Sequence, residues 1–401
     1  MNYTFSCILF SCLFKADSFY GSFFVINCSE MGINIMIIKN GIVFMQDGAF
    51  HRQNIYTNGK LITASDEVHD RKIIDAEGLY VLPGLVDIHT HGAVGHDFCD
   101  GDAKGLKEIA EYEKSCGITS FCPTSMTFSE SRLSGIFETI NYLQPSDNLA
   151  RVAGINMEGP FISSSKKGAQ NKKYIQNPDI EMFAKLNEKC NNRIRIITIA
   201  PELEGSMDFI NKYHDKVTIS LGHSDASYET ALEAINAGAT HITHLFNAMP
   251  PYNHRNPGIV GAAIDNNDIM VEIICDGVHI HPSVIKTVFK LFGDKRVILI
   301  SNSMEATGMP DGEYELGGQR VYKNGSYATL SDGTIAGSVT NLFNCMKNAI
   351  NYGIPPESAI KAATCNPAKS IGLSGKIGTL AENAYADIIL VDKNFELVRI
   401  L

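Results

Sequence analysis

Short apolar runs separated by turn residues dominate the first part of the chain. From residue 33 to about 78 these runs alternate with Gly-containing turn pairs, a pattern typical of strands and hairpins. The segment 33–44 predicts two strands around a turn, and the whole stretch predicts a small β unit. A late apolar run at 386–391 predicts a further strand, which we expect to join the same unit. The turn pairs are Asn40-Gly41, Asp47-Gly48 and Asn58-Gly59.

The pattern changes at about residue 79, where strand-like runs begin to alternate with helical ones. One helical stripe, for example, combines Leu106, Ile109 and Ala110 ahead of Gly117, as expected for a helix that covers a sheet. Eight β/α units over roughly 83–376 predict an α/β fold, a distorted (β/α)8 barrel of TIM type. Its active site would lie at the carboxyl ends of the strands. The strand-like runs are 80–88, 119–123, 152–157, 194–200, 217–221, 241–246, 269–275 and 297–301.

Two domains follow from these patterns. We expect residues 83–376 to form the barrel, and 31–82 together with 377–401 to form a small β-sandwich domain built from both chain ends. Residues 1–30 are predicted to be a tail outside the fold, because a cleaner start appears at about Met31 or Met36.

An apolar run at 5–14 is the one segment of this tail that resembles a targeting signal. No Lys or Arg precedes it, and Lys15 and Asp17 follow it directly. It therefore matches neither a secretory signal, which needs a basic start, nor a membrane span, which needs about 20 apolar residues.

The acidic composition excludes a general nucleic-acid binder. The chain carries 34 Lys and Arg against 44 Asp and Glu, a net charge of −10, whereas such proteins present a basic face. The 10 cysteines contain no C-x-x-C pair, which is typical of reduced thiols in a reducing compartment. We therefore expect a cytoplasmic protein with no nucleic-acid and no membrane partner. The 12 histidines gather in a few segments, and these are where chemistry is expected.

The strongest chemical signal is a pair of histidines in the stretch PGLVDIHTHG at 83–92. Side chains alternate along a strand, so His89 and His91 point to the same face at the carboxyl end of the first barrel strand. Two imidazoles placed in this way are typical of a pair of metal ligands. A pair of hydrogen-bonded histidines at a barrel rim is the alternative for an isolated motif.

Three further strand ends carry residues of the same kind. Glu158, His223 and His244 each follow an apolar strand, and a single one of them is equally compatible with a hydrogen-bonded core residue. A buried carboxylate or imidazole without a partner is costly, so four converging strand ends favour a divalent metal site. Nitrogen and carboxylate ligands without cysteine fit one or two ions of Zn, Fe, Mn, Co or Ni.

Several motifs occur in the order typical of a known family. They are PGLVDIHTHG, MEGPFI, APE at 200–202, GHSDASY, HLFNAMPP, RNPG at 255–258 and DGVH at 276–279. From about residue 33 onward the sequence resembles the amidohydrolase superfamily and, within it, the N-acetylglucosamine-6-phosphate deacetylases. The resemblance implies a homodimeric enzyme of amino-sugar metabolism. Its reaction is hydrolysis of the acetamide of N-acetylglucosamine 6-phosphate to glucosamine 6-phosphate and acetate.

The resemblance also implies roles for the metal-ligand candidates. Glu158, His223 and His244 match the principal ligands, and Glu158 can bridge a second ion. His89 and His91 match the pair that holds this second ion in members that retain both histidines. Their retention here favours a binuclear site. The metal would polarise the acetyl carbonyl and lower the pKa of the attacking water.

The phosphate end of the substrate has counterparts as well. The backbone N–H groups of Asn247 and Ala248 match the family's phosphate cradle. Arg255 and His279 match its charged partners, one or both reaching in from a neighbouring subunit. The planar fork of arginine suits phosphate, although a solvated loop residue is the alternative for Arg255 taken alone. Gln170 matches a substrate-side loop position where some relatives carry His, which leaves its role in orienting the carbonyl open.

One position departs from the family pattern. There the eighth strand ends in Thr-Asp, and the Asp activates the water and then protonates the leaving amine. This chain has Ser301-Asn302 instead. A neutral amide cannot accept a proton at useful pH. Loss of a general base typically costs on the order of 10²- to 10⁴-fold in rate, so we expect impaired turnover.

Three explanations compete for Asn302. The first is a deliberate change that traps substrate. The second is natural divergence into a non-catalytic amino-sugar-phosphate binding paralogue. The third is that another carboxylate, such as Glu305 or Asp311, replaces the base. Ser301 in place of Thr favours natural divergence. Another metal-dependent amidohydrolase remains the alternative activity, and the implied phosphate site argues against it.

Overall fold

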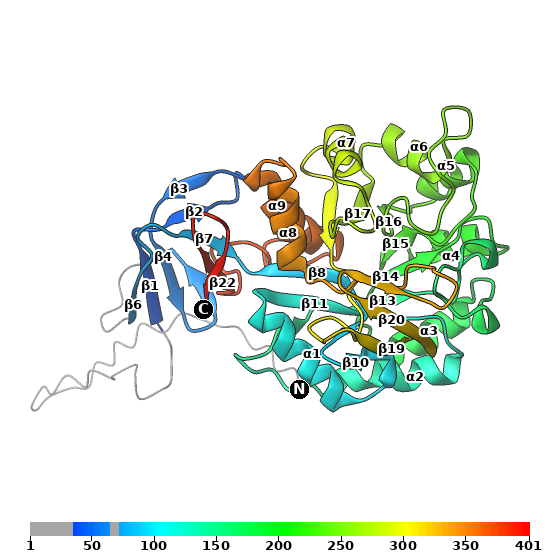
Figure 1. Cartoon of the computed structure of the whole chain (residues 1–401), viewed down its shortest axis with the longest axis horizontal. Helices are drawn as coiled ribbons and strands as arrows, with labels where there is room; N and C mark the ends of the chain where they lie inside the picture. Colours follow the sequence, from blue (N-terminus) through cyan, green and yellow to red (C-terminus); the bar gives the residue numbers. More distant parts are fainter. Residues whose placement is uncertain (1–34, 65–71) are drawn as a thin grey trace, which may run out of the picture.

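The computed structural model describes residues 35–64 and 72–401, in which a barrel of strands and helices lies beside a smaller all-β region (Figure 1). The predicted tail at 1–30 lies outside the described residues. The first described strands and the last ones, blue and red in Figure 1, meet in the all-β region. The domain limits at residues 31, 83 and 377 stay predictions.

Eight parallel strands form the barrel in the described part of the chain, which confirms the predicted TIM-type fold. Beyond β18 the chain continues alongside β8. There the Asn302 N–H donates to the His89 carbonyl at 2.9 Å, and the His91 N–H donates to the Ser303 carbonyl at 2.8 Å. These bonds bring the last strand end next to the first. The strands are β8 (Leu85–Thr90), β11 (Ile118–Ser125), β13 (Ile155–Glu158), β14 (Ile194–Ile199), β15 (Thr218–Leu221), β16 (His241–Ile242), β17 (Met270–Ile274) and β18 (Val297–Ile300).

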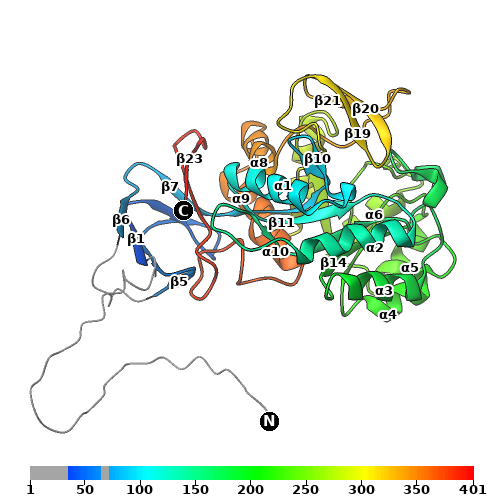
Figure 2. The same ribbon diagram turned by 90° about the horizontal axis from the view of Figure 1, so that it is seen from below.

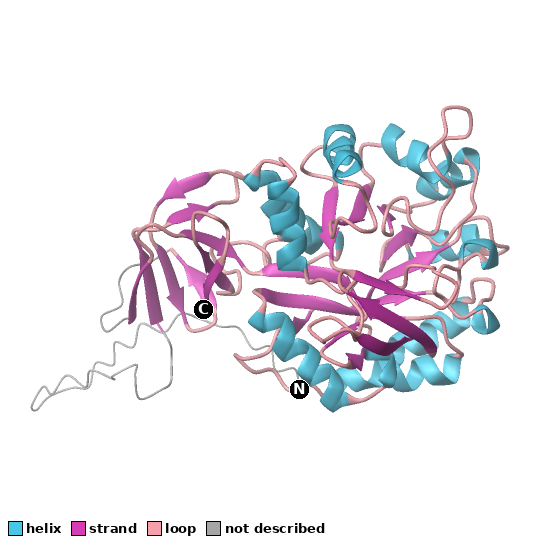
Figure 3. Cartoon of the chain, viewed as in Figure 1, coloured by secondary structure: helices cyan, strands magenta, loops and turns pink. Residues whose placement is uncertain are grey.

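Helices cover the outer surface of the barrel (Figure 3). In α1 the Asp102 side chain accepts the N–H groups of the first turn, Leu106 and Ile109 are buried, and Gly117 follows with φ 83°. The predicted apolar stripe is therefore confirmed. The helices are α1 (Ala103–Ser115), α2 (Glu130–Glu138), α3 (Ile180–Lys189), α4 (Ser206–Tyr213), α5 (Tyr228–Asn236), α6 (Gly258–Asp265), α7 (Pro282–Phe292), α8 (Leu342–Asn351), α9 (Pro356–Ala363) and α10 (Cys365–Ser370). Short 3-10 turns occur at Phe98–Asp100, Thr139–Asn141, Ser164–Lys166 and Lys172–Tyr174.

The all-β region contains two sheets. One has the order β5 (Leu61–Thr63), β4 (Ile55–Asn58), β1 (Ile35–Lys39) and β6 (Lys72–Asp75). The other has the order β23 (Leu397–Ile400), β22 (Ile388–Val391), β7 (Tyr80–Pro83), β2 (Ile42–Phe44) and β3 (Phe50–Arg52). The late strand β22 thus pairs with the early strand β7, as the sequence predicted, and β23 pairs with β22.

Two details of the strand prediction are wrong. The strands around Asn40-Gly41 exist, but β1 and β2 belong to different sheets and do not form a hairpin. Gly41 passes so close to the second sheet that a Cβ there would lie 2.4 Å from a Val81 methyl group. Likewise the single run 80–88 is divided between β7 and the barrel strand β8. The division occurs at Gly84, whose Cβ would lie 2.2 Å from the Thr119 hydroxyl.

A three-stranded antiparallel sheet follows the last barrel strand, and the sequence did not reveal it. It contains β19 (Gly312–Leu316), β20 (Gln319–Asn324) and β21 (Tyr327–Thr329). Figure 2 shows it at one edge of the barrel, above β10. The Gln319 amide donates to the Ala169 carbonyl, so this sheet contacts the loop that follows β13. The remaining short strands are β9 (Gly92–Ala93), β10 (His96–Asp97) and β12 (Arg151–Val152).

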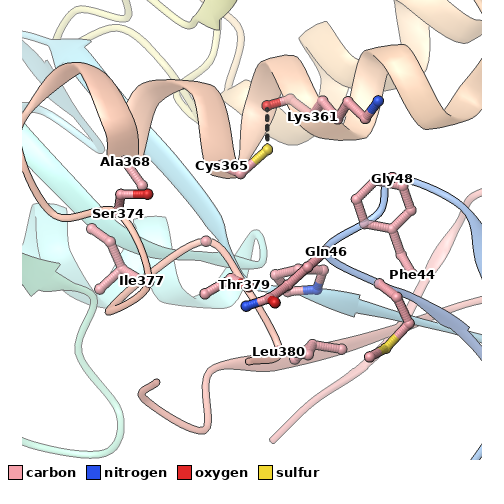
Figure 4. Close-up of a pocket in the computed structure, with 14 residues that line it drawn as sticks. Phe44, Gln46, Gly48, Lys361, Cys365, Ala368, Ser374, Ile377, Thr379 and Leu380 are labelled. Atoms are coloured by element: carbon pink, nitrogen blue, oxygen red, sulfur yellow. Dashed lines mark hydrogen bonds between the residues drawn. The ribbon is translucent and has the colours of Figure 1, made fainter. Parts of the chain in front are cut away.

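A cavity of about 230 Å³ lies between the all-β region and helices α9 and α10 (Figure 4). Its lining includes Lys361 and Cys365, and the Lys361 ammonium is paired with Asp294 at 2.7 Å. None of the metal-ligand candidates lines this cavity. Among the described helices, none combines the length and the apolar character needed to cross a membrane.

Candidate metal centre and active site

The predicted ligands come together at the carboxyl ends of four barrel strands. His89 and His91 lie at the end of β8, and Glu158 is the last residue of β13. His223 and His244 each stand two residues beyond a strand, with φ 47° and 26°. Non-glycine residues rarely adopt positive φ, and such strain is held at functional sites by the surrounding structure.

Glu158 lies at the centre of this arrangement. Its Oε1 atom is 2.9 Å from His244 Nε2, 3.1 Å from His223 Nε2 and 3.4 Å from His89 Nε2. Its Oε2 atom is 3.6 Å from His91 Nε2. Two clusters therefore share the carboxylate, and in each cluster the ligand atoms lie within 4.8 Å of one another. The first cluster is Glu158 with His89 and His91, and the second is Glu158 with His223 and His244.

Burial and charge shift the pKa values of these groups strongly. Burial would raise the pKa of Glu158, but the charges of His89 and His223 hold it well below its usual range. Burial lowers the pKa of His91 to about 4. For His89 burial acts in the same direction, but the carboxylates of Glu272 and Glu158 outweigh it and raise the pKa to about 10. The cluster thus holds Glu158 ionised and His91 neutral, the states in which both can bind a metal.

The donor atoms fit a divalent metal ion. Three of the four histidines have Nδ1 held by another group: His89 by Glu272 at 3.0 Å, His91 by the Thr124 carbonyl at 3.2 Å and His223 by the Lys166 carbonyl at 2.9 Å. Their Nε2 atoms are thereby directed towards Glu158. The fully buried His89 Nε2 has no hydrogen-bond partner among the described residues. Such an atom is costly unless it binds something.

A cavity of about 260 Å³ lies against the second cluster and holds most of the predicted substrate residues. Gln170, Asn247, Ala248 and His279 line it together with Asn302. Four residues from the segment after β18 also line the cavity. The sequence analysis did not identify them as candidates: Leu316, Thr334, Ile335 and Gly337.

Gln170 and His279 have fixed orientations in this cavity. The Gln170 amide donates to Glu158 Oε2 at 2.7 Å and accepts the Thr127 N–H at 2.7 Å. His279 Nδ1 lies 2.7 Å from Asp276 Oδ2. Gln170 therefore braces the shared carboxylate, which the sequence could not show.

Arg255 differs from the other predicted substrate residues. It is exposed in the loop before α6 and does not line the cavity of its own chain. Its backbone N–H is held by the Asn253 side chain at 2.9 Å, but no described acidic side chain pairs with its guanidinium in an ion pair.

Asn302 lies two residues beyond β18 and lines the cavity. It has φ 50°, its N–H donates to the His89 carbonyl, and its own carbonyl accepts the Ser338 N–H at 2.7 Å. The side-chain oxygen is buried without a hydrogen-bond partner among the described residues. The two carboxylates considered as substitutes lie elsewhere: Glu305 accepts the Glu315 N–H, and Asp311 is exposed and accepts the Gly325 N–H. Neither lines the cavity.

Glu272 is a functional candidate that the sequence analysis missed. It lies within β17, is fully buried and contacts His89. Burial would raise the pKa of its carboxyl group, but the charge of His89 keeps it lowered. The signal was a single carboxylate inside the apolar run MVEII, because a buried acid is costly unless a partner compensates its charge.

Comparison with known proteins identifies the family of the chain. Residues 80–400 match the amidohydrolase family. The chain belongs to the amidohydrolase family. It is 34% identical over 372 residues to the N-acetylglucosamine-6-phosphate deacetylase of Bacillus subtilis (strain 168), which covers 90% of this chain and 91% of that one. It is 31% identical over 329 residues to the N-acetylgalactosamine-6-phosphate deacetylase of Escherichia coli O157:H7, covering 81% and 86%.

A solved structure is similar over almost the whole described fold. It is an aspartate-to-alanine mutant of N-acetyl-D-glucosamine-6-phosphate deacetylase from Mycobacterium smegmatis in complex with N-acetyl-D-glucosamine-6-phosphate. The TM-score is 0.85 at 28% identity, covering 92% of this chain and 98% of that chain. Members of the amidohydrolase family use divalent metal ions, and the two histidine and glutamate clusters are groups that could hold such an ion. The protein is therefore a metal-dependent hydrolase.

Proposed function

We propose that the protein hydrolyses the acetamide of N-acetylglucosamine 6-phosphate, releasing glucosamine 6-phosphate and acetate. The observation that carries the proposal is the pair of clusters sharing Glu158 beside a cavity lined by Gln170, Asn247, Ala248 and His279. The named activity of its relatives supports the same substrate. His89, His91, Glu158, His223 and His244 would hold one or two divalent ions.

The chain's own residues have separate tasks in this reaction. When bound by the two clusters, a divalent ion would supply Lewis-acid chemistry, polarising the amide carbonyl and lowering the pKa of the attacking water. Gln170 keeps the Glu158 carboxylate in one orientation through its 2.7 Å hydrogen bond. Ala248 and His279 would bind the phosphate. Asn247 would join them by exchanging the hydrogen bond that its N–H donates to the His244 carbonyl at 2.9 Å.

Arg255 would complete the phosphate site from a neighbouring subunit. Its exposure outside the cavity of its own chain is what this arrangement requires. The proposed assembly is a homodimer in the cytoplasm, and its charged loop supplies the positive potential that an acidic chain needs for an anionic substrate.

Asn302 is expected to impair this reaction. Its amide oxygen can hold a water molecule or the substrate by a hydrogen bond, but it cannot take a proton from the water or return one to the leaving amine. We therefore propose slow turnover with intact substrate binding. Tight binding without measurable turnover would instead favour the alternative, a substrate-trapping binding paralogue.

The test combines binding and turnover on the same metal-loaded protein. N-acetylglucosamine 6-phosphate binding is measured by calorimetry, and acetate release is followed with Zn, Fe, Mn, Co and Ni in turn. We expect binding together with slow acetate release. Absence of both, with the metal in place, would refute the proposal.

N-acetylgalactosamine 6-phosphate is the second candidate substrate. The relative from Escherichia coli that carries this name supports it. The two sugars differ only at one hydroxyl configuration, so the ratio of kcat/KM values for them assigns the preference.

A further inference from the structure

Glu272 is a buried carboxylate without an obvious structural purpose. It is fully buried in the middle of β17, where its neighbours along the strand are apolar. Its Oε1 atom has no hydrogen-bond partner among the described residues. A charge buried in this way costs several kcal/mol unless nearby groups compensate it. Its contacts therefore indicate what it does.

One oxygen of Glu272 reaches both metal-ligand clusters. The Oε2 atom lies 3.0 Å from His89 Nδ1 and accepts the His244 backbone N–H at 3.1 Å. His89 belongs to the first cluster and His244 to the second. The two contacts differ in kind, because the first holds an imidazole ring and the second holds only the main chain.

The contact with His89 has a chemical consequence. An ionised carboxylate only accepts hydrogen bonds, so His89 Nδ1 must carry the proton that it shares with Glu272. The other ring nitrogen, Nε2, then faces the first cluster, 3.4 Å from Glu158 Oε1, and binds a metal once it has released its own proton. Outer carboxylates of this kind fix the tautomer and the ring orientation of metal-binding histidines.

A second buried histidine lies near the other oxygen of Glu272. His241 Nε2 lies 3.5 Å from Oε1, and His241 Nδ1 lies 2.8 Å from the Ser370 hydroxyl. Both His241 and Glu272 are fully buried. No hydrogen bond joins the two residues, so among the described residues the hydrogen bonds of the Glu272 carboxylate are those that its Oε2 atom makes with His89 and His244.

We propose that Glu272 is a positioning residue that orients His89 and so strengthens metal binding at the first cluster in preference to the second. The asymmetry follows from the contacts. A glutamine at this position could still accept the His244 N–H through its amide oxygen, but it could not hold the ring of His89 with the same charge. The inference requires metal at the two clusters and does not require deacetylation.

The test measures metal affinity in the full-length protein. Zn binding by the wild type and by Glu272→Gln is titrated against a chelator, and metal content is determined after dialysis. We expect one ion to bind about 10- to 100-fold more weakly in the variant, while the affinity for the other changes little. The matched control is Glu113→Gln, because Glu113 is also fully buried and both its oxygens lack partners among the described residues. This control should leave both affinities unchanged.

A double-mutant cycle separates positioning from general packing. If Glu272 acts through the ring of His89, then adding Glu272→Gln to a His89→Asn protein should change the metal affinity by no more than about 2-fold. Equal affinities in the wild type and Glu272→Gln, an equal loss in Glu113→Gln, or an undiminished effect in the His89→Asn background would each overturn the proposal.

Glu272→Asp replaces Glu272→Gln if the latter does not accumulate as folded protein. The shorter side chain moves the carboxylate away from His89, so the affinity for the same ion should fall. Since the readout is metal binding, a failed deacetylase assay would refute the proposed function and leave this inference standing.

Discussion

The all-β region and the mouth of the barrel both bury side chains, but the buried groups of the first are mainly aliphatic and those of the second include polar ones. Between the two sheets the buried groups are mainly aliphatic, a set we call the sandwich core: Ile38, Val43, Ile55, Ile62, Ile74, Val81, Ile388 and Leu390. At the barrel mouth the fully buried groups include His89, Glu272 and Asn156. Apolar burial stabilises the first region directly. The second contains buried polar atoms that need a partner.

Backbone geometry follows the same division. In the all-β region positive φ at non-glycine residues is confined to turns, at Asn40, Asn383 and Phe395. At the barrel mouth it occurs at the candidate site residues themselves, His223, His244 and Asn302, with φ 47°, 26° and 50°. Strained backbone and unsatisfied polar atoms lower stability and are retained where they serve a function. We infer that one region contributes stability and the other chemistry, and this division can be tested.

Restoring the carboxylate at the barrel mouth should have the largest effect. Asn302→Asp supplies a group that can accept a proton in the position of the family's base. We expect acetate release to rise on the order of 10²- to 10⁴-fold, measured as kcat with N-acetylglucosamine 6-phosphate. An unchanged rate with full metal content would show that the site is not a disarmed deacetylase.

Removing the shared ligand should affect metal binding more than folding. Glu158 contacts histidines of both clusters, so Glu158→Gln should weaken both ions by more than the roughly 100-fold upper range for outer residues. Metal analysis and chelator titration measure this. Retention of both ions would contradict the assignment of the clusters. The melting temperature of the metal-depleted protein should change less than in the following variant.

Truncating the sandwich core should do the reverse. Ile388 is fully buried in β22, and Ile388→Ala should cost about 2–5 kcal/mol of unfolding free energy through lost burial and a cavity. Denaturant unfolding measures the loss. Ile388→Val is the graded control, with an expected cost of about 0.5–1.5 kcal/mol. Metal affinity should stay at the wild-type value, and its loss would show that the two regions are coupled.

The smallest effect concerns pH and Asp97 at the barrel rim. Burial raises the pKa of Asp97 to about 8, with Asp100 and Glu305 adding to the shift, although the Cys99 N–H opposes it. The folded protein therefore holds a proton that the unfolded chain releases above pH 4. The stability contributed by this proton is present at low pH and is lost as pH rises through about 8.

Asp97→Asn removes this dependence. Its amide oxygen can still accept the Cys99 N–H, which Asp97 accepts at 2.6 Å. We expect the melting temperature of the variant, relative to that of the wild type, to increase from pH 5 to about 8. Calorimetry at matched ionic strength measures this difference. The control Asp332→Asn changes an exposed residue and should show no such gain. A constant difference across the range would contradict the prediction.

The apolar pattern of the sequence predicts some of these strands and helices and not others, for a physical reason. Alternating and helical patterns come from burial of one face of an element, so the barrel strands, α1 and β22 were predictable. The same patterns could not show that the run at 80–88 serves two sheets, because a change of sheet needs only one glycine at a crowded point. Nor could they show the sheet β19–β21, whose exposed strands carry little apolar periodicity.

The candidate site was predictable only as far as its residues follow strands. His89, His91, Glu158, His223 and His244 could be found because an imidazole or a carboxylate at the end of an apolar strand is unusual. Glu272 was missed, although it stands out in the same way, because it lies inside a strand and not at its end.

The sequence by itself determined the alternating barrel, the kinds of ligand at its strand ends and the neutral amide at residue 302. These depend on residue types and on local periodicity. Only the tertiary structure decided that one carboxylate is shared by two clusters, that Gln170 and Glu272 hold these ligands, and that Arg255 lies outside the cavity of its own chain. Such relations join residues from different strands and loops, and their distances are set by the closing of the barrel.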